Sequence, residues 1–172
     1  MPEFIPVLQK REIDGLVAEI ARKISDDYRN RDLVLIGVLK GAFIFLSDLV
    51  RQLTIPAHVE FLRAASYGDG VSSSGTVRLL MEPQIDLHGR DALLVEDIVD
   101  SGLTLQFLID YLKRAGARST KVCALIDKQE RRSVDVTVDY ACHRVSEGFL
   151  VGYGLDYAES YRGLPGIYHL KL

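Results

Sequence analysis

An α/β fold with a parallel sheet flanked by helices is the architecture that this 172-residue sequence predicts. Short apolar runs alternate along the chain with segments of helical periodicity, which is the pattern of strand–helix–strand units. Residues 32–39 are almost continuously apolar, as in a parallel strand that is covered on both faces. The length suffices for one domain with a substantial core, and 48% hydrophobic and 26% charged residues are ordinary for a globular domain.

The first half of the chain carries two predicted helices and two predicted strands. Residues 12–28 have apolar positions at helical spacing: Ile13, Leu16, Val17, Ile20 and Ile24. The apolar strand 32–39 leads into a predicted helix over 41–53. The inward face of that helix is expected to hold Phe43, Leu46, Leu49 and Val50. A second strand is predicted over 57–65.

The second half repeats the alternation. A third strand is predicted over 91–95, a helix over 104–115 that Gly116 stops, and a fourth strand over 120–126. Shorter strands are predicted over 76–81, 134–140 and 149–153. The glycine- and serine-rich residues 66–75 are expected to form a mobile loop between two strands. This loop lacks the third glycine of a dinucleotide fingerprint, and the chain has no Walker A sequence.

Charge and cysteine content exclude several classes of protein. A net charge of −3 is not the basic charge that nucleic-acid binders carry. The short basic clusters at 118–121 and 131–132 are interpreted as solvated or ligand-facing. No apolar run approaches a membrane span, and the first residues lack the features of a signal peptide, so we expect a cytoplasmic protein. Cys123 and Cys142 fit neither a disulfide framework nor a zinc ligand set, and are expected to be buried thiols.

Residues 94–104 carry the most informative pattern in the chain. They read Leu-Val-Glu-Asp-Ile-Val-Asp-Ser-Gly-Leu-Thr: an apolar strand, adjacent carboxylates at Glu96 and Asp97, a third at Asp100, and a small-residue loop that opens a helix. The free N–H groups at a helix start bind phosphate. Carboxylates beside a phosphate repel it unless they serve another part of the ligand, such as sugar hydroxyls or a divalent cation.

This segment resembles the phosphoribosyl-diphosphate signature of the type I phosphoribosyltransferases. Its sequence is similar to that of the hypoxanthine-guanine branch in particular. The resemblance implies that Glu96 and Asp97 hold the ribose 2′ and 3′ hydroxyls and help to organise Mg²⁺. It implies a catalytic role for Asp100 beside purine N7. The residues expected to wrap the 5′-phosphate are Ser101, Gly102, Leu103 and Thr104.

Three further segments extend the resemblance over most of residues 30–165. The turn after the first parallel strand, Leu39, Lys40 and Gly41, matches the family's pyrophosphate turn, in which the Leu-Lys peptide is often cis. Ser66 and Tyr67 begin the Gly/Ser-rich loop and match a lid over the reacting centre. A lid has a clear purpose, because water would capture a developing ribosyl cation in an open site.

The third segment matches a base pocket. The resemblance implies that Lys128 donates to the purine 6-oxo group, that Phe149 stacks on the base, and that backbone groups near Val151 and Asp156 read its Watson–Crick edge. It further assigns Asp156 to a second Mg²⁺ and Arg162 to pyrophosphate. Residues 141–148 depart from the family pattern, which leaves the rim of the pocket and the base preference open.

The sequence thus predicts one phosphoribosyltransferase domain over 1–172, with a core at about 30–130, a mobile loop, and a small base-binding hood built from the termini and including about 134–172. Its expected ligands are phosphoribosyl diphosphate, hypoxanthine and guanine with Mg²⁺, and its expected assembly is a homodimer or homotetramer, without nucleic acid or membrane. Alternatives are a transferase for xanthine, orotate or a pyrimidine, an RNA-binding regulator of the same fold, and a nucleotide-binding protein without transferase activity. Lys128 and Phe149 disfavour a pyrimidine pocket, and the acidic net charge disfavours RNA.

Overall fold

The computed structural model describes residues 2–67 and 76–171. Its elements in chain order are β1 (Glu3–Leu8), α1 (Lys10–Asp27), β2 (Leu33–Val38), α2 (Phe43–Gln52), β3 (His58–Tyr67), β4 (Thr76–Met81), β5 (Asp91–Val99), α3 (Leu103–Arg114), β6 (Ser119–Lys128), β7 (Tyr140–Val145), β8 (Leu150–Val151) and β9 (Ile167–Lys171).

A six-stranded sheet forms the centre of the molecule, in the order β4-β3-β2-β5-β6-β7. Strands β2, β3, β5, β6 and β7 pair in parallel, and only β4 is antiparallel to its neighbour, β3. Strand β2 is buried at every position, as its continuous apolar run predicts. The predicted parallel α/β sheet is confirmed.

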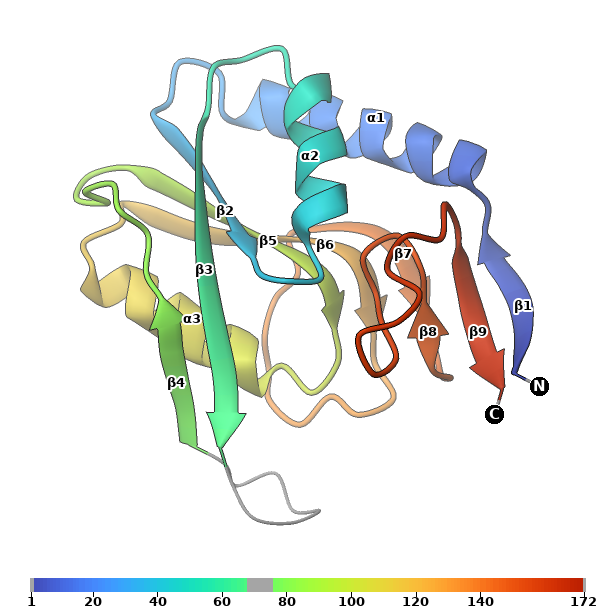
Figure 1. Ribbon diagram of the computed structural model, residues 1–172. Coiled ribbons are helices and arrows are strands. Elements are labelled where there is room, and N and C mark those ends of the chain that lie inside the picture. The colour runs from blue at the N-terminus through green and yellow to red at the C-terminus, as the bar shows by residue number, and fades with distance from the viewer. Residues whose placement is uncertain (1, 68–75, 172) are drawn as a thin grey trace.

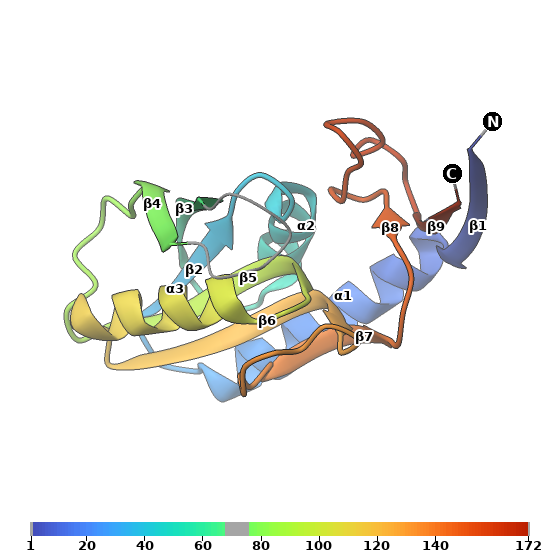
Figure 2. The same ribbon diagram turned by 90° about the horizontal axis from the view of Figure 1, so that it is seen from below.

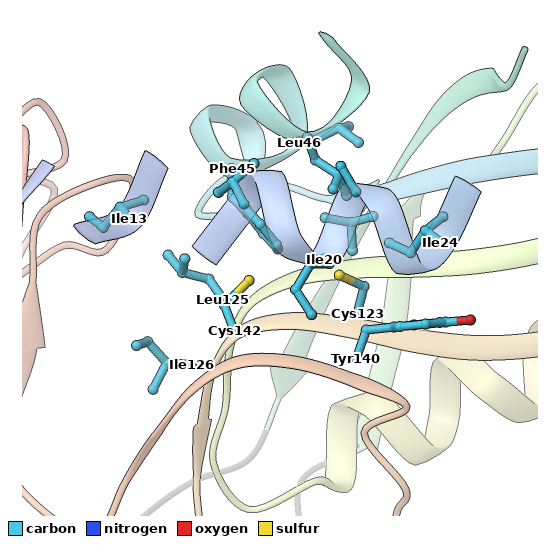
Figure 3. Packing of buried hydrophobic residues seen from close by; sticks show 14 of the residues in the cluster. Ile13, Ile20, Ile24, Phe45, Leu46, Cys123, Leu125, Ile126, Tyr140 and Cys142 are labelled. Atoms are coloured by element: carbon cyan, nitrogen blue, oxygen red, sulfur yellow. The ribbon is translucent and has the colours of Figure 1, made fainter. Parts of the chain in front are cut away.

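Helices cover both faces of this sheet (Figure 1). Their packing creates two apolar clusters, one on each face. Helices α1 and α2 pack against one face, where Ile20 and Ile24 of α1 meet Cys123 of β6 (Figure 3). Helix α3 packs on the other face through Leu108 and its neighbours. Both cysteines are buried free thiols in the first cluster, as expected.

The inward face of α2 differs from the prediction at one residue. The helix begins at Phe43, which is 45% exposed, whereas Phe45, Leu46 and Leu49 are buried. The reason is helical phase, because positions 45, 46 and 49 lie on one side of the helix and position 43 lies off that side. Val50 is half-buried and packs against the same cluster.

Most of the predicted strands have bounds that differ from the observed ones, and one strand was predicted at the wrong place. Strand β5 continues four residues beyond 95, and β3 continues through Tyr67. Residues 134–140 are not a strand up to 139, and the strand instead begins at Tyr140. Val134 and Val136 are apolar residues at every second position, as in a strand, but they do not pair with another strand of the described chain. They pack beside Gly102, so the alternation of apolar residues here reflects tertiary packing.

A second, smaller sheet stands beside the first and consists of three antiparallel strands in the order β1-β9-β8. It joins segments from the two ends of the chain, and α1 runs from this small sheet to the central sheet (Figures 1 and 2). The strands at 3–8 and 167–171 were not predicted from the sequence. Within the described residues, no helix combines the length and apolarity that crossing a membrane requires.

Candidate active site

The predicted site residues converge at the carboxyl end of the parallel sheet. Lys40 follows β2, Glu96 and Asp97 lie near the end of β5, and Lys128 is the last residue of β6. Strands β2, β5 and β6 are neighbours and parallel, so their ends meet at one edge. This edge is where open α/β sheets bind ligands.

Glu96 and Asp97 lie inside β5, and they face opposite sides of the sheet. Glu96 lines a hollow of about 150 Å³ with Asp100 and Ser101, on the α3 side. Asp97 faces the turn between β2 and α2, where a Cβ on Gly41 would overlap its carboxylate. Because successive strand side chains alternate, adjacent acids in a strand reach two different regions of a site.

Burial makes both carboxyl groups costly to ionise. It raises the pKa of Glu96 well above its usual value, and the neighbouring Asp97 carboxylate adds to this rise. Burial also raises the pKa of Asp97 to about 6, although the Ile98 N–H donates to its Oδ1 over 2.8 Å and opposes the rise. A divalent cation or a hydroxyl donor at these oxygens would stabilise the ionised forms.

The β5–α3 loop (residues 100–102) provides a phosphate-sized recess. Gly102 is the N-terminal cap of α3 and has a φ of +85°, and a side chain there would lie 2.8 Å from Val136 Cγ2. The Ser101 Oγ accepts the Leu103 N–H at 3.3 Å. The 150 Å³ hollow is lined by Glu96, Ile98, Val99, Asp100, Ser101, Gly102, Thr104 and Leu105. The N–H groups of the first helical turn have no partner within the helix, so this recess suits an anion.

Asp100 contributes a buried acceptor to the same hollow. Its Oδ1 atom is fully buried and has no hydrogen-bond partner among the described residues. Its backbone carbonyl accepts the Arg132 Nε–H at 2.9 Å. A buried carboxylate oxygen without a partner is costly unless a ligand donates to it or shares its proton.

The β2–α2 turn (residues 39–42) connects the acidic strand to the small-sheet side of the site. The Leu39–Lys40 peptide is cis. Gly41 is packed between Asp97 and Gly154: a Cβ on Gly154 would overlap the Gly41 carbonyl oxygen. Three segments far apart in the sequence therefore meet at Gly41, which lies against the side chain of Asp97 and the backbone of Gly154.

The predicted pyrophosphate ligands are paired with acids in this structure. The Lys40 Nζ lies 2.7 Å from Glu159 Oε2, with both side chains largely exposed. The Arg162 Nη2 lies 3.0 Å from Asp156 Oδ1, and Nη1 donates to the Gly154 carbonyl at 2.7 Å. The Nε of Arg162 is buried without a partner in the described part of the chain, so this guanidinium retains a free donor.

The predicted base-pocket residues come from β6 and the small-sheet region. Lys128 is almost fully buried, and its Nζ lies 3.1 Å from Glu130 Oε2. Phe149 is 51% exposed, and its ring meets Tyr157 edge to face at 5.6 Å. Phe149 and Glu130 line one hollow of about 430 Å³. Val151 is completely buried in β8.

Ser66 and Tyr67 are the last residues of β3, so the prediction that they begin the Gly/Ser-rich loop is wrong. They pair with Val77 and Thr76 of β4. The rest of the predicted lid, residues 68–75, lies outside the described residues.

Three residues at this edge were missed by sequence reasoning. Glu130 and Glu159 pair with the two predicted lysine ligands, and Arg132 is tied to the β5–α3 loop by hydrogen bonds. The pair Arg131-Arg132 was interpreted as solvated or ligand-facing, yet the side chain of Arg132 is only 19% exposed. The available signal was that Glu130 and Arg132 stand two and four residues after the strand-end lysine.

The carboxylates suit Mg²⁺ only in combination with substrate oxygens. Within residues 2–67 and 76–171, no three His, Cys, Asp or Glu side chains are grouped so that they could hold a metal. Glu96, Asp97 and Asp156 instead offer separate carboxylate oxygens around the edge. Mg²⁺ is commonly bound by one or two carboxylates together with phosphate oxygens and water, so this arrangement fits it.

The chain matches the model of the phosphoribosyl transferase domain family over residues 7–158, and it belongs to that family. A hypoxanthine-guanine phosphoribosyltransferase from Aquifex aeolicus is 43% identical over 166 residues, covering 96% of this chain and 93% of the relative. A hypoxanthine phosphoribosyltransferase from Salmonella typhimurium is 40% identical, covering 92% and 90%. A crystal structure of a hypoxanthine-guanine phosphoribosyltransferase from Bacillus anthracis superimposes with a TM-score of 0.92 at 36% identity over the whole of both chains. These relatives place the chain in the hypoxanthine-guanine branch, as its resemblance predicts.

Proposed function

We propose that this enzyme transfers the 5-phosphoribosyl group of phosphoribosyl diphosphate to N9 of hypoxanthine or guanine. The products are IMP or GMP and pyrophosphate, a purine-salvage reaction. The observation that supports this most directly is the buried, unpartnered Oδ1 of Asp100 in the hollow that the β5–α3 loop forms. The loop offers N–H groups to a 5′-phosphate, and the carboxylate beside it can take a proton from the base.

In this reaction the C1′–O bond breaks early, which leaves positive charge on the ribose and negative charge on pyrophosphate. Lys40 and Arg162 would hold pyrophosphate after exchanging their contacts with Glu159 and Asp156, and Ser101 to Thr104 would hold the 5′-phosphate. Asp97 and Glu96 would fix the ribose hydroxyls. Mg²⁺, when bound by these carboxylates, Asp156 and the diphosphate, supplies charge that offsets the leaving group.

The base would lie between the small sheet and the end of β6. Lys128 would donate to the 6-oxo group, Phe149 would stack on the ring, and backbone groups near Val151 and Asp156 would read the Watson–Crick edge. Asp100 would accept a proton from, or hydrogen-bond, purine N7 and so raise the nucleophilicity of N9. The small sheet then acts as the base-binding hood of a single domain.

Xanthine remains a second candidate base, because residues 141–148 depart from the family pattern at the rim of the pocket. Supplying phosphoribosyl diphosphate and Mg²⁺ with hypoxanthine, guanine, xanthine, adenine or uracil, and measuring pyrophosphate, separates the candidates. We expect release with hypoxanthine and guanine and none with uracil. Release with uracil alone or with adenine alone would contradict the assignment. The absence of release with all five bases would leave only a nucleotide-binding role.

We further propose a cytoplasmic homodimer or homotetramer that binds neither nucleic acid nor membrane. The net charge of −3 supports the absence of a nucleic-acid partner. Sedimentation velocity tests the assembly, and a salt-dependent RNA-binding assay tests the alternative of an RNA-binding regulator.

A further inference from the structure

We propose that Arg132 is a positioning residue that fixes the spacing between Asp100 and Lys128, and that it thereby makes the site selective for 6-oxopurines. This inference rests on the proposed function. Arg132 follows β6 by four residues and does not line the hollow of the β5–α3 loop. It instead donates hydrogen bonds to the main-chain carbonyls of Asp100 and Lys128.

The guanidinium holds the β5–α3 loop on one side. Its Nε donates to the Asp100 carbonyl at 2.9 Å, and its Nη2 approaches the Val99 carbonyl at 3.4 Å. Both acceptors are main-chain atoms, so Arg132 constrains the path of the loop and leaves the Asp100 carboxylate free. The Oδ1 of that carboxylate accordingly has no partner in the part of the chain that the structure describes.

The same guanidinium also holds the end of β6. Its Nη2 donates to the Lys128 carbonyl at 3.1 Å and contacts Asp127 Oδ1 at 2.5 Å. The Asp127 side chain is 5% exposed and the Arg132 side chain 19%, so water screens this ion pair little. One planar group therefore ties the main chain at Asp100 to the main chain at Lys128.

The neighbouring residues reinforce this connection. The Ser133 N–H donates to the Ser101 carbonyl at 3.0 Å, and the Ser133 hydroxyl contacts the same oxygen at 3.3 Å. A Cβ on Gly102 would lie 3.4 Å from the Arg132 side chain and 3.0 Å from Val134. Residues 132–134 thus form the support on which the β5–α3 loop rests.

Arginine suits this role because its guanidinium presents five N–H donors in a fixed plane. A lysine has one flexible ammonium group, which cannot keep the geometry of Asp100 O, Lys128 O and Asp127 Oδ1 at once. The arrangement matters because N7 and O6 are neighbours on one edge of a 6-oxopurine. The N7–H would donate to the Asp100 carboxylate, and O6 would accept from the Lys128 ammonium. Asp100 and Lys128 would contact that single edge, so a fixed distance between their backbones matches this class of base.

The test compares Arg132→Met and Arg132→Lys with the control Arg131→Met, in which the neighbouring exposed arginine is changed. Wild-type activity with hypoxanthine and phosphoribosyl diphosphate is measured first, and its absence would refute the proposed function before the variants are considered. Steady-state kinetics then give kcat/KM for hypoxanthine and for unsubstituted purine, which has N7 but no 6-oxo group. Thermal melting shows that each variant is folded at the assay temperature.

We expect kcat/KM for hypoxanthine to fall at least about tenfold in both Arg132 variants, as one lost charge-assisted bond at a site predicts. The fall should be smaller for purine, because purine uses only one of the two spaced contacts. Arg131→Met should match the wild type. Unchanged hypoxanthine kinetics in Arg132→Lys, or equal losses for hypoxanthine and purine, would overturn the proposal, since a purely structural role lowers melting temperature without changing base selectivity. If Arg132→Met does not fold, Arg132→Lys decides alone.

Discussion

Replacing Lys128 by methionine should remove most of the use of 6-oxopurines and leave the binding of phosphoribosyl diphosphate nearly intact. The Lys128 side chain is only 8% exposed, at the end of a buried strand. An exposed ion pair contributes about 0–1 kcal/mol, but a charge-assisted hydrogen bond in a desolvated site contributes about 1.5–3 kcal/mol. At 1.4 kcal/mol per decade, the loss corresponds to about 10- to 150-fold in kcat/KM for hypoxanthine. Methionine keeps an unbranched side chain of similar length, so packing changes little.

Glu130 provides the matched control for this substitution. Its carboxylate lies 3.1 Å from the Lys128 Nζ and is 43% exposed, so Glu130→Gln frees the ammonium without opening a cavity. A lysine has three donors, and a bound base and Glu130 can both be served. We therefore expect Glu130→Gln to change kcat/KM for hypoxanthine far less than Lys128→Met does.

The assay is pyrophosphate release at varied hypoxanthine and, separately, at varied phosphoribosyl diphosphate. Three results would refute the reasoning. Normal hypoxanthine kinetics in Lys128→Met would remove this lysine from the base pocket. A dominant rise in KM for phosphoribosyl diphosphate would place it at the donor instead. A loss in Glu130→Gln as large as that in Lys128→Met would mean that the ion pair, and not the contact to the base, matters.

Three further predictions concern the Asp100 carboxylate, the contact of Gly154 with the β2–α2 turn, and Asp91 at the start of β5. Asp100→Asn should lower turnover by about 10²–10⁴-fold with a modest loss of donor affinity, and near-normal turnover with poor affinity would show a loop brace instead. Gly154 has a φ of +103° and lies against the β2–α2 turn, so Gly154→Ala should lower the free energy of unfolding by about 1–3 kcal/mol. Gly15 is exposed in α1 with open space around it, so Gly15→Ala should raise the free energy of unfolding by up to about 1 kcal/mol. Urea unfolding measures both changes. The Arg118 guanidinium holds the pKa of buried Asp91 below its usual value, so this stabilisation is present above about pH 4 and is lost as the pH falls through the folded-state pKa. Asp91→Asn should therefore cost about 1–3 kcal/mol at pH 7, and the difference from wild type in urea unfolding should shrink in acid; a constant difference would argue against the ion pair.

The sequence predicted the parts of the fold that depend on local pattern. The buried strand β2 and the amphipathic helix α1 follow from apolar periodicity, and the family follows from the segment around Glu96 to Thr104. The pattern failed where tertiary context decides. Val134 and Val136 alternate like strand residues but pack against Gly102. Residues 140–145 form β7, yet the polar His143 and Arg144 interrupt the apolar pattern from which a strand is predicted.

The candidate site shows the same division. The residue types of the β5–α3 loop and the strand-end lysine could be predicted, because phosphate and carbonyl recognition restrict them locally. The partners of those residues could not. Three acceptors of Arg132 are backbone oxygens, up to 33 positions away, and no side-chain pattern predicts them. The opposite orientation of Glu96 and Asp97 follows from the continuation of β5 to Val99, whereas the apolar run that predicts the strand ends at Val95.

That opposite orientation has a consequence for how this site can change over evolutionary time. Strand β5 is pinned between β2 and β6, with Val95 paired to both Gly37 and Cys123. Removing or inserting one residue before Glu96 would exchange the two faces and send each carboxylate to the other's compartment. Point substitutions can adjust this strand, but single-residue length changes cannot. Such changes are better tolerated in the 82–90 connection outside the strands, so the family's length variation should collect there and spare β5.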